Sequence, residues 1–457
     1  MSLEIHINNQ ASFHRGKPTI FCMPDIKDSE RFIRLCYQHN LNLILLIKKK
    51  WLDSTDYSLA LAHLIIDDPL ADNACKRIIS ALKQVKDTLA IITGPVQINY
   101  FMAFSELHVE LMATIAAYIN QNPHIIDVAQ SFRDKWVMRK VANEHGIFCP
   151  QFTLASEILT SPERFQAFTA AVEHSARHKG NKVGFIVKPR SFWGSMGVTE
   201  YSDRTSLLCA LQKLDTPGEY LVEEKIQGKL LHVDTAVLQH KIIYQGIGAY
   251  ACSLLSSDQT EPNHFMWHTM LPDSPDSRRL FEFNQQVLQA FNLEYGFTHT
   301  EIFIEENTDN LILCETASRP PGLKLFDLHA LAYNSHAFDT FINALISPSS
   351  IYASSICASS IGKEPSFSIE HPDPNCIGMI IFNPPIGKVK SLTPIEEIID
   401  EHVIEWEQYT KTGSYFTNTH YTEKMGYIIF SAKNEHECLK YLKNYKTNFH
   451  YTITKQD

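Results

Sequence analysis

Two acidic residues are predicted to face each other in a β-hairpin. Residues 299–315 contain two short runs in which apolar residues alternate with polar ones, separated by the polar stretch 306–310. This pattern predicts a hairpin with a five-residue loop. With the loop centred on Thr308, Glu301 faces Glu315, about 5 Å apart, where two carboxylates repel by about 3 kcal/mol at an effective dielectric near 20. One interpretation is an exposed hairpin with solvated side chains, and the other is a site that uses both acids.

A lysine at the end of a predicted strand precedes a glycine-containing loop. Residues 183–187 form an apolar run, Lys188 follows it, and Pro189 stops the strand before a loop that holds Gly194 and Gly197. Backbone N–H groups of such a loop can cradle a phosphate, and a lysine adds a point charge. The segment does not match G-x-x-x-x-G-K-[ST]. A surface loop with an exposed lysine is the alternative.

A third stretch, residues 219–228, reads as a short strand that ends in a turn. The backbone of a free strand edge can pair with the edge of a purine. A peripheral strand with solvated charges is the alternative. His232 and Asp234 follow at alternate positions, so they are predicted to share one face of a strand.

Composition limits the classes of protein that this chain can belong to. The 457 residues allow two or three domains, and 44% hydrophobic with 20% charged residues is typical of a globular protein. The net charge of −10 disfavours a nucleic-acid partner. Ten cysteines without a C-x-x-C motif suggest neither a zinc site nor a disulfide framework. The first residues lack the pattern of a signal peptide, and apolar runs such as 43–47 are too short to span a bilayer. We therefore expect a cytoplasmic protein that does not enter a membrane.

The elements that must position these residues follow from apolar spacing. In the first 127 residues, predicted strands alternate with predicted helices, which indicates an α/β layer with a parallel sheet. The strands are Thr19–Cys22, Leu43–Ile47, His63–Ile66 and Leu89–Thr93, and the helices are 30–39, 71–86 and 105–120. Further along, residues 132–145 predict a helix that ends at Gly146. The hairpin register that pairs the two acids also pairs Phe303 with Leu313.

Changes in pattern along the chain predict four segments. An N-terminal α/β unit spans 1–127, and a strand-rich unit spans 128–346. A stretch rich in Ser and Pro, 347–375, reads as a linker. A small C-terminal α+β unit, 376–457, holds strands at 378–382 and 426–431 and a helix at 435–444.

Four stretches, in this order, resemble the ATP-grasp superfamily. They are 132–139 (FRDKWVMR), 186–190 (IVKPR), 221–228 (LVEEKIQG), and the hairpin that closes with 315–322 (ETASRPPG). The flanking units are similar to those of bacterial L-amino acid ligases and carnosine synthase-like enzymes. The resemblance implies an ATP-grasp architecture of mixed α/β and α+β class, with an N-terminal parallel α/β domain and a small C-terminal α+β domain.

The resemblance also implies roles for individual residues. Glu301 and Glu315 would bind Mg²⁺, which prefers carboxylate, phosphate and water oxygens. The implied nucleotide-binding residues are Lys135, Lys188, Ser195, Gly197, Glu223, Glu224, Ile226 and His232. Lys188 and Arg319 would be catalytic, and the arginine fork suits a transferring phosphate. The implied substrate-binding residues are His268, Arg319 and Gly322, and we expect residues 250–272 and 320–323 to line the acceptor pocket.

This sequence departs from the family pattern at two positions. Ala317 stands where the family usually has a metal-binding Asn, two residues after the second acid. One oxygen ligand would then come from water, and binding of a second metal ion is in question. The usual ribose-binding acid would fall near Leu230, so His232 or an acid elsewhere would take that role.

Family members typically phosphorylate a carboxylate with ATP and let an amine attack the acyl phosphate. The implied function is therefore an ADP-forming carboxylate–amine ligase that uses ATP and Mg²⁺, or Mn²⁺ in its place, with an amino acid or similar small acid and an amine as substrates. The alternatives are another ATP-grasp reaction, such as that of a carboxylase or a kinase, and a non-catalytic ATP-binding protein. The sequence leaves the two substrates open and allows a homodimer.

Overall fold

The computed structural model describes residues 3–8, 12–24, 29–51, 60–255, 264–347, 376–417 and 423–454. A mostly parallel sheet forms its N-terminal part. The strands lie in the order β1-β4-β3-β2-β5. Their bounds are Leu3–Ile7 (β1), Thr19–Met23 (β2), Asn42–Lys48 (β3), Ala62–Ile66 (β4) and Tyr100–Ala103 (β5). β2 to β5 are parallel, as predicted, and β1 pairs antiparallel with β4. The helices are α1 (Ser29–Gln38), α2 (Ala74–Thr93) and α3 (Val109–Asn120).

The strand predicted at Leu89–Thr93 is wrong. These residues form the last turns of α2, which ends before Gly94. Leu82, Val85 and Leu89 are buried on one face of this helix and contact the sheet. Their spacing of three and four is helical, and it continues without interruption into the short apolar run that looked like a strand. The remaining parallel strand is β5 instead.

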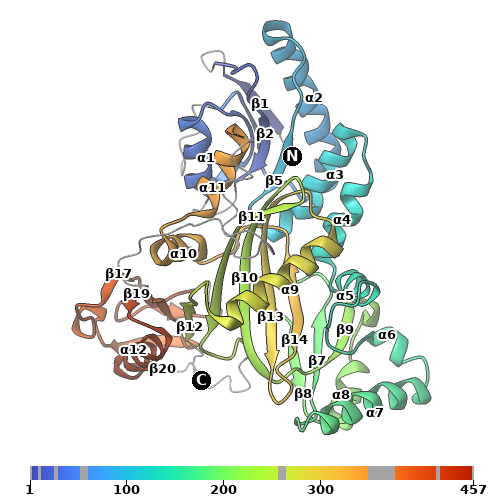
Figure 1. Cartoon of the computed structure of the whole chain (residues 1–457), viewed down its shortest axis with the longest axis vertical. Helices are drawn as coiled ribbons and strands as arrows, with labels where there is room; N and C mark the ends of the chain where they lie inside the picture. Colours follow the sequence, from blue (N-terminus) through green and yellow to red (C-terminus); the bar gives the residue numbers. More distant parts are fainter. Residues whose placement is uncertain are drawn as a thin grey trace.

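A large antiparallel sheet forms the middle of the molecule, with strand order β14-β13-β10-β11-β12-β15-β19-β17 (Figure 1). The bounds are Gly228–Leu238 (β10), Lys241–Tyr250 (β11), Phe265–Thr269 (β12), Tyr295–Glu305 (β13), Leu311–Ala317 (β14), Cys376–Phe382 (β15), Val403–Gln408 (β17) and Gly426–Ala432 (β19). Helix α9 (Pro275–Phe291) packs on one face, and α10 (Leu325–Tyr333) and α11 (Ala337–Ile346) follow the hairpin. Strands from the C-terminal segment thus extend the sheet that carries the predicted hairpin.

Two smaller sheets flank the large one. The first has the order β6-β9-β7-β8, with β6 at Phe152–Leu154, β7 at Phe185–Pro189, β8 at Thr199–Tyr201 and β9 at Tyr220–Glu224. Its helices are α6 (Ala155–Ile158), α7 (Pro162–His178) and α8 (Arg204–Leu211), which lie at the lower right of Figure 1. The second sheet holds β16 (Gly387–Leu392), β18 (Tyr415–Phe416) and β20 (Tyr451–Thr454), and α12 (Glu435–Asn448) lies beside it. The expected linker 347–375 lies almost entirely outside the described residues, and the segment boundaries stay a prediction.

The helix predicted at 132–145 is two helices. Helix α4 (His124–Arg133) ends and α5 (Lys135–Glu144) begins at Asp134, whose backbone is extended. The Asp134 carboxylate accepts a hydrogen bond from the backbone N–H of Trp136 at 2.9 Å, which caps α5. This break makes Lys135 the first residue of a helix, and its position matters for the site described below.

The predicted hairpin is present, with one change of register. Its loop covers 306–310, and Glu301 pairs with Glu315 as predicted. Phe303 pairs with Ile312 rather than Leu313, because the register shifts between Glu301 and Ile302. Cys314 is the extra residue of this β-bulge, a feature that alternation of apolar residues does not reveal.

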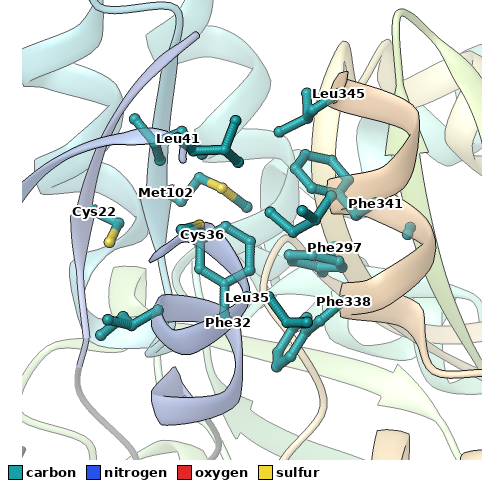
Figure 2. Packing of buried hydrophobic residues seen from close by; sticks show 14 of the residues in the cluster. Cys22, Phe32, Leu35, Cys36, Leu41, Met102, Phe297, Phe338, Phe341 and Leu345 are labelled. Carbon is teal, nitrogen blue, oxygen red and sulfur yellow. The ribbon is translucent and has the colours of Figure 1, made fainter. Parts of the chain in front are cut away.

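An aromatic cluster joins the N-terminal sheet to the large sheet. Phe32 of α1 contacts Phe338 of α11, with ring centres 5.6 Å apart, and Phe297 of β13 lies 4.9 Å from Phe341 (Figure 2). All four rings are buried. Helix α11, which follows the hairpin in sequence, therefore packs beside α1 near the start of the chain. In the part of the chain that the structure describes, no helix is both long and apolar enough to cross a bilayer.

Candidate functional site

A cavity of about 1110 Å³ lies where the four-stranded sheet, the large sheet and the N-terminal unit meet. Most of the predicted site residues line it: Lys135, Lys188, Ser195, Glu223, Glu224, Ile226, His268, Glu301, Glu315, Arg319 and Gly322. These residues come from nine elements or loops spread over almost 190 positions of the sequence. Two predicted residues, Gly197 and His232, do not line the cavity.

The two glutamates of the hairpin both reach this cavity. Glu301 lies in β13 and accepts a hydrogen bond from the Tyr250 hydroxyl at 3.0 Å. Glu315, opposite in β14, forms an ion pair with the Lys135 ammonium at 2.9 Å. Burial raises the pKa of Glu301, but contacts with His299 and Tyr250 outweigh it, so this pKa lies below its ordinary value. Glu301 is therefore ionised at neutral pH.

Lys135 links the hairpin to the glycine-containing loop. Its side chain is almost fully buried, and its ammonium donates a hydrogen bond to the backbone carbonyl of Phe192 at 2.6 Å. The backbone N–H of Lys135 also donates to the carbonyl of Arg190 at 3.0 Å. The break at Asp134 thus places one lysine between a loop that could cover a ligand and the acid Glu315.

The second lysine, Lys188, belongs to a buried charge network. Its ammonium lies 2.7 Å from Glu223 Oε2. The same carboxylate accepts a hydrogen bond from Arg139 Nε at 2.8 Å, and Arg139 Nη2 donates to the carbonyl of Cys314, at the bulge, at 2.6 Å. Burial raises the pKa of Glu223, but Arg139 and Lys188 lower it below its ordinary value. Arg139 was not predicted as a site residue, although it belongs to one of the family-like stretches.

Arg319 is held by an acid from the N-terminal unit. Its Nε and Nη2 donate to Glu106 Oε2 at 3.2 and 3.0 Å, and Arg133 Nη1 lies 3.4 Å from Glu106 Oε1. The Arg133 guanidinium in turn lies 5.7 Å from the centre of the Trp193 ring. Glu106 lines the cavity and is buried, yet no sequence signal identified it, because it lies 213 residues before its partner.

The loop after β7 has residues in the left-handed backbone conformation that glycine favours. Gly194, Ser195 and Gly197 all have positive φ, at 60°, 59° and 72°. A Cβ atom on Gly197 would lie 2.8 Å from Pro189 Cγ, so both the positive φ and the close packing favour glycine there. Ser195 lines the cavity, as do Phe192 and Trp193.

The segment predicted to read adenine differs from expectation in one respect. Strand β9 pairs with β6 on one side and β7 on the other, so its edge is not free. The Glu224 carboxylate accepts hydrogen bonds from Ser175 at 2.8 Å and Lys179 at 3.2 Å. Residues 225–227, between β9 and β10, line the cavity together with Glu223 and Glu224, and Ile226 is among them.

His232 lies in a buried cluster of imidazoles around Asp234. The Trp267 indole N–H donates to His232 Nε2, and His232 Nδ1 lies 3.0 Å from Asp234 Oδ2, which confirms that His232 and Asp234 share a face. His299 Nδ1 lies 2.6 Å from Asp234 Oδ1. Burial lowers the pKa of His299, but Asp234 and Glu301 raise it to about 9. His232 is fully buried, and the structure does not bring it to the cavity where a ribose could contact it.

The remaining predicted residues line the part of the cavity formed by β12 and the turn before α10. Because the expected acceptor region lies here, this part is called the acceptor end. His268 is almost fully buried and lines it, together with Gly322 in the turn before α10. Glu435 and Leu439 of α12 line the same end, and neither was predicted. Part of the expected acceptor region, residues 256–263, lies outside the described residues.

Two groups of side chains offer metal ligands. Glu301 and Glu315 present carboxylate oxygens to the cavity, a donor set that fits Mg²⁺, and Ala317 adds no side-chain oxygen. His232, Asp234 and His299 place potential ligand atoms within 4.8 Å of one another, but these atoms already contact each other at hydrogen-bonding distance. The glutamate pair is therefore the candidate metal site.

The fold was compared with known proteins. No family model and no curated protein sequence matches this chain. Among solved structures, the L-amino acid ligase from Bacillus licheniformis is 17% identical, with a TM-score of 0.65, covering 96% of this chain and 99% of the ligase. Phosphoribosylglycinamide synthetase from Anaerococcus prevotii is 12% identical, with a TM-score of 0.59, covering 96% of this chain and all of the synthetase.

A third similar structure carries a bound nucleotide. The biotin carboxylase domain of the Hydrogenobacter thermophilus 2-oxoglutarate carboxylase, a dimer crystallised with MgADP and bicarbonate, is 13% identical, with a TM-score of 0.57. The match covers 97% of this chain and 92% of the carboxylase domain. These three proteins are ATP-grasp enzymes. The match over nearly the whole chain confirms the fold expected from the four sequence stretches: this protein has the ATP-grasp fold.

Proposed function

We propose that this chain is an ATP-dependent carboxylate–amine ligase that forms an amide or peptide bond through an acyl phosphate and releases ADP and phosphate. One observation carries the proposal: Glu301, Glu315, Lys135, Lys188 and Arg319 line a single cavity. Phosphoryl transfer needs little covalent work by the protein, but it needs positioned cations and neutralised phosphate charge. The three cationic side chains, together with a pair of acids that can bind a metal cation, would supply both the positioning and the neutralising charge.

Each residue has a distinct task in this proposal. Glu301 and Glu315 would hold Mg²⁺, which would supply positive charge to neutralise the phosphates of the nucleotide. Lys135 and Lys188 bind and orient the phosphates of ATP. The carboxylate of the acid substrate attacks the γ-phosphorus, ADP leaves, and Arg319 stabilises the negative charge on the transferred phosphoryl group. The amine then attacks the acyl carbon, and phosphate leaves.

Water must be kept from the acyl phosphate, and the loop 191–197 is the segment proposed to do so. Phe192 and Trp193 line the cavity beside Lys135 and Arg133. Closure of this loop over the nucleotide would exclude solvent and strengthen the electrostatic contacts inside. Before closure, the Trp193 ring lies 5.7 Å from the guanidinium of Arg133, which is linked to Arg319 through Glu106, and closure would change this contact.

The similar structures support two candidate reactions. The L-amino acid ligase has a higher TM-score than the biotin carboxylase domain. Amino-acid substrates also agree with the mixture of charged and apolar groups at the acceptor end of the cavity. The carboxylase domain, crystallised with bicarbonate, makes ATP-dependent carboxylation the second candidate. ADP release that depends on bicarbonate and not on an amine would favour the carboxylase.

The proposal also covers ligands, oligomeric state and location. We propose ATP as the nucleotide, a small carboxylate and an amine as the other substrates, and a homodimer as the state to test by light scattering. We also propose a cytoplasmic location without nucleic-acid or membrane partners, from the net charge of −10 and the absence of a C-x-x-C motif.

A substrate screen tests the ligase proposal. Pairs of amino acids and amines are incubated with ATP and Mg²⁺, and phosphate release is measured. Glu315→Gln should lower turnover by at least about a hundredfold, because a neutral amide is a weaker ligand for a metal bound to phosphates. Glu282→Gln, on the exposed face of α9, is the matched control and should keep wild-type turnover. Turnover within a few-fold of wild type in a folded Glu315→Gln protein would contradict the metal-site assignment.

A further inference from the structure

The protein holds one oxygen of the Glu301 carboxylate much more firmly than the other. Oε1 accepts a hydrogen bond from the Tyr250 hydroxyl at 3.0 Å and lies 3.7 Å from His299 Nε2. Among the residues that the structure describes, Oε2 has a single and weak hydrogen-bonding contact, with the Cys314 thiol at 3.8 Å. Oε1 is therefore fixed by protein groups, and Oε2 remains for a ligand.

Tyr250 and His299 also contact each other. His299 Nε2 lies 3.3 Å from the Tyr250 hydroxyl oxygen. Tyr250 is the last residue of β11, and β10 separates this strand from β13, which carries Glu301. The Tyr250 side chain crosses β10 over His232, with ring centres 5.3 Å apart, to reach the carboxylate. Two side chains from different strands thus converge on the same oxygen of Glu301.

Asp234 fixes the orientation of the His299 ring. The two residues are paired in the register of β10 and β13, and His299 Nδ1 lies 2.6 Å from Asp234 Oδ1. Burial raises the pKa of Asp234, but His232 and His299 lower it below its ordinary value, so the carboxylate is ionised and only accepts hydrogen bonds. His299 Nδ1 therefore carries a hydrogen, and Nε2 is directed toward Tyr250 and Glu301.

Two further rings support Asp234 from the other side. His232 Nδ1 lies 3.0 Å from Asp234 Oδ2, and the Trp267 indole N–H donates to His232 Nε2. The Trp267 ring lies over β11 at Gly248, where a Cβ atom would lie 2.3 Å from Trp267 Nε1, so glycine is needed there. Asp234, His232 and Trp267 are fully buried. The support behind His299 is therefore rigid.

The second acid of the pair is held in a different way. Glu315 contacts Lys135, which is itself proposed to bind phosphate, so this contact would change when a nucleotide enters. Tyr250 and His299 are not assigned to the nucleotide, and their contacts with Glu301 would persist. Glu301 is thus the acid of the pair whose place is set before a ligand binds.

We infer that Tyr250 and His299 are positioning residues that hold Oε1 of Glu301, so that Oε2 meets the metal ion in one fixed place. The inference rests on the proposed function, in which Glu301 binds Mg²⁺, and it adds the residues that determine the affinity of that site. Carboxylates that bind metals depend on hydrogen bonds of this kind, and loss of such a partner costs about ten- to a hundredfold in metal affinity.

Binding of Mn²⁺ to the complex of the protein with ADP tests the inference without turnover, and electron paramagnetic resonance measures the free ion. Tyr250→Phe removes the hydroxyl and keeps the ring, and it should raise the Kd for Mn²⁺ about ten- to a hundredfold. Tyr244→Phe, in the same strand, is the matched control. The Tyr244 hydroxyl is buried, has no hydrogen-bond partner among the described residues and does not line the cavity, so the Kd should stay unchanged.

Two variants of His299 separate its two contacts. Asparagine places its amide nitrogen near the position of Nδ1 and keeps the donor to Asp234, whereas glutamine places it near Nε2 and keeps the donor to Tyr250 and Glu301. His299→Asn should therefore weaken Mn²⁺ binding as much as Tyr250→Phe does, and His299→Gln should weaken it less. Equal losses in the two variants would mean that His299 only fills space, and they would overturn its positioning role.

A double variant shows whether Tyr250 acts through Glu301. In a Glu301→Gln protein, Tyr250→Phe should change the Kd for Mn²⁺ by less than about threefold, because the carboxylate that it positions is already lost. A loss as large as in the wild-type background would overturn the inference.

The outcomes also separate the inference from the proposed function. Mn²⁺ binding that depends on Tyr250 and His299, in a protein that releases no ADP with any pair of substrates, would support the inference and contradict the ligase. ADP release by a protein whose Mn²⁺ affinity is the same in wild type, Tyr250→Phe and His299→Asn would support the ligase and overturn the inference.

Discussion

Each cation of the candidate active site is paired with an acid of the protein. Lys135 pairs with Glu315, Lys188 with Glu223, and Arg319 with Glu106. Buried cations are costly unless they are paired, so these contacts let the protein keep three positive charges in one cavity. Glu223 and Glu106 each also contact a second cation, Arg139 and Arg133 respectively. The ion pairs therefore hold the three cations in place in the absence of a ligand.

Arg319 is expected to act mainly on the transition state. Its planar fork meets charge that grows as the phosphoryl group is transferred, so its contact should strengthen along the reaction. Arg319→Ala should lower kcat by about a hundredfold or more and change the Kd for ATP by less than about threefold. Steady-state kinetics and calorimetry measure the two quantities.

The control for this prediction is Arg278→Ala, on the exposed side of α9, which should leave both quantities unchanged. Arg319→Lys keeps the charge but not the fork, and it should recover only part of the lost kcat. A loss of ATP affinity as large as the loss of kcat would mean that Arg319 binds the nucleotide in the ground state.

At the scale of elements, local sequence patterns predicted the hairpin and the pairing of its two acids, but not its bulge or the break between α4 and α5. The pairing of Glu301 with Glu315 followed from loop length and alternation, and it is correct. The pairing of Phe303 with Leu313 was wrong, because the bulge at Cys314 shifts the register on the loop side. The carbonyl of Cys314 accepts from Arg139, a contact between residues 175 positions apart. A bulge fixed by so distant a partner leaves no local pattern in the sequence.

The errors in helices have the same origin. Asp134 was predicted to lie in the first turn of one helix, but it caps α5, and its carboxylate also accepts from Arg190 Nη2 at 2.5 Å. Glu106, Glu435 and Leu439 reach the cavity only through the packing of distant elements. Family-like motifs identified the residues proposed to act on phosphate, whereas these three cavity residues could be found only from the tertiary structure.

The loop 191–197 should move when nucleotide binds. Trp193 lines the cavity and rests near Arg133, so closure over phosphates would change its surroundings. Tryptophan emission should shift on addition of Mg·ATP, and Trp193→Phe should remove most of the change. Trp406→Phe, in β17, is the control and should leave the change intact. An unchanged spectrum at saturation, in protein shown by calorimetry to bind ATP, would contradict loop closure.

At the scale of the whole molecule, the cavity depends on contact between units that are distant in sequence. The aromatic cluster around Phe32 and Phe338 joins α1 to α11, and Glu106 reaches Arg319 across the same interface. The strands of the C-terminal segment continue the large sheet, and α12 closes the acceptor end. Stability of the whole fold is therefore a condition for the site.

Two buried histidines should make this stability depend on pH. Burial lowers the pKa of His264 to about 4 and that of His329 to about 3, although Asp234 opposes the second shift. The unfolded chain, with a histidine pKa near 6.5, binds these protons more readily. The stabilisation is thus fully present above pH 6.5 and is lost as the pH falls toward 4, by about 2 kcal/mol for each histidine at pH 5.

Urea unfolding at pH 7.5, 6 and 5 measures this loss. His329→Gln, which cannot be protonated, should show a smaller decrease in unfolding free energy between pH 7.5 and 5 than wild type. His436→Gln, in the exposed first turn of α12, is the control and should follow wild type. An identical pH dependence in wild type and His329→Gln would show that His329 does not contribute.

The products of ATP turnover test the central claim most directly. Lys135, Lys188, the loop 191–197 and the pair Glu301–Glu315 are all assigned to the β- and γ-phosphates, so the attacked atom should be the γ-phosphorus. Phosphorus NMR of a reaction with acid, amine and ATP should show ADP and phosphate in equal amounts, and hydroxylamine should trap the activated acid as a hydroxamate when the amine is omitted. AMP and pyrophosphate as the stoichiometric products would mean that the acid is activated as an adenylate, and they would contradict the account.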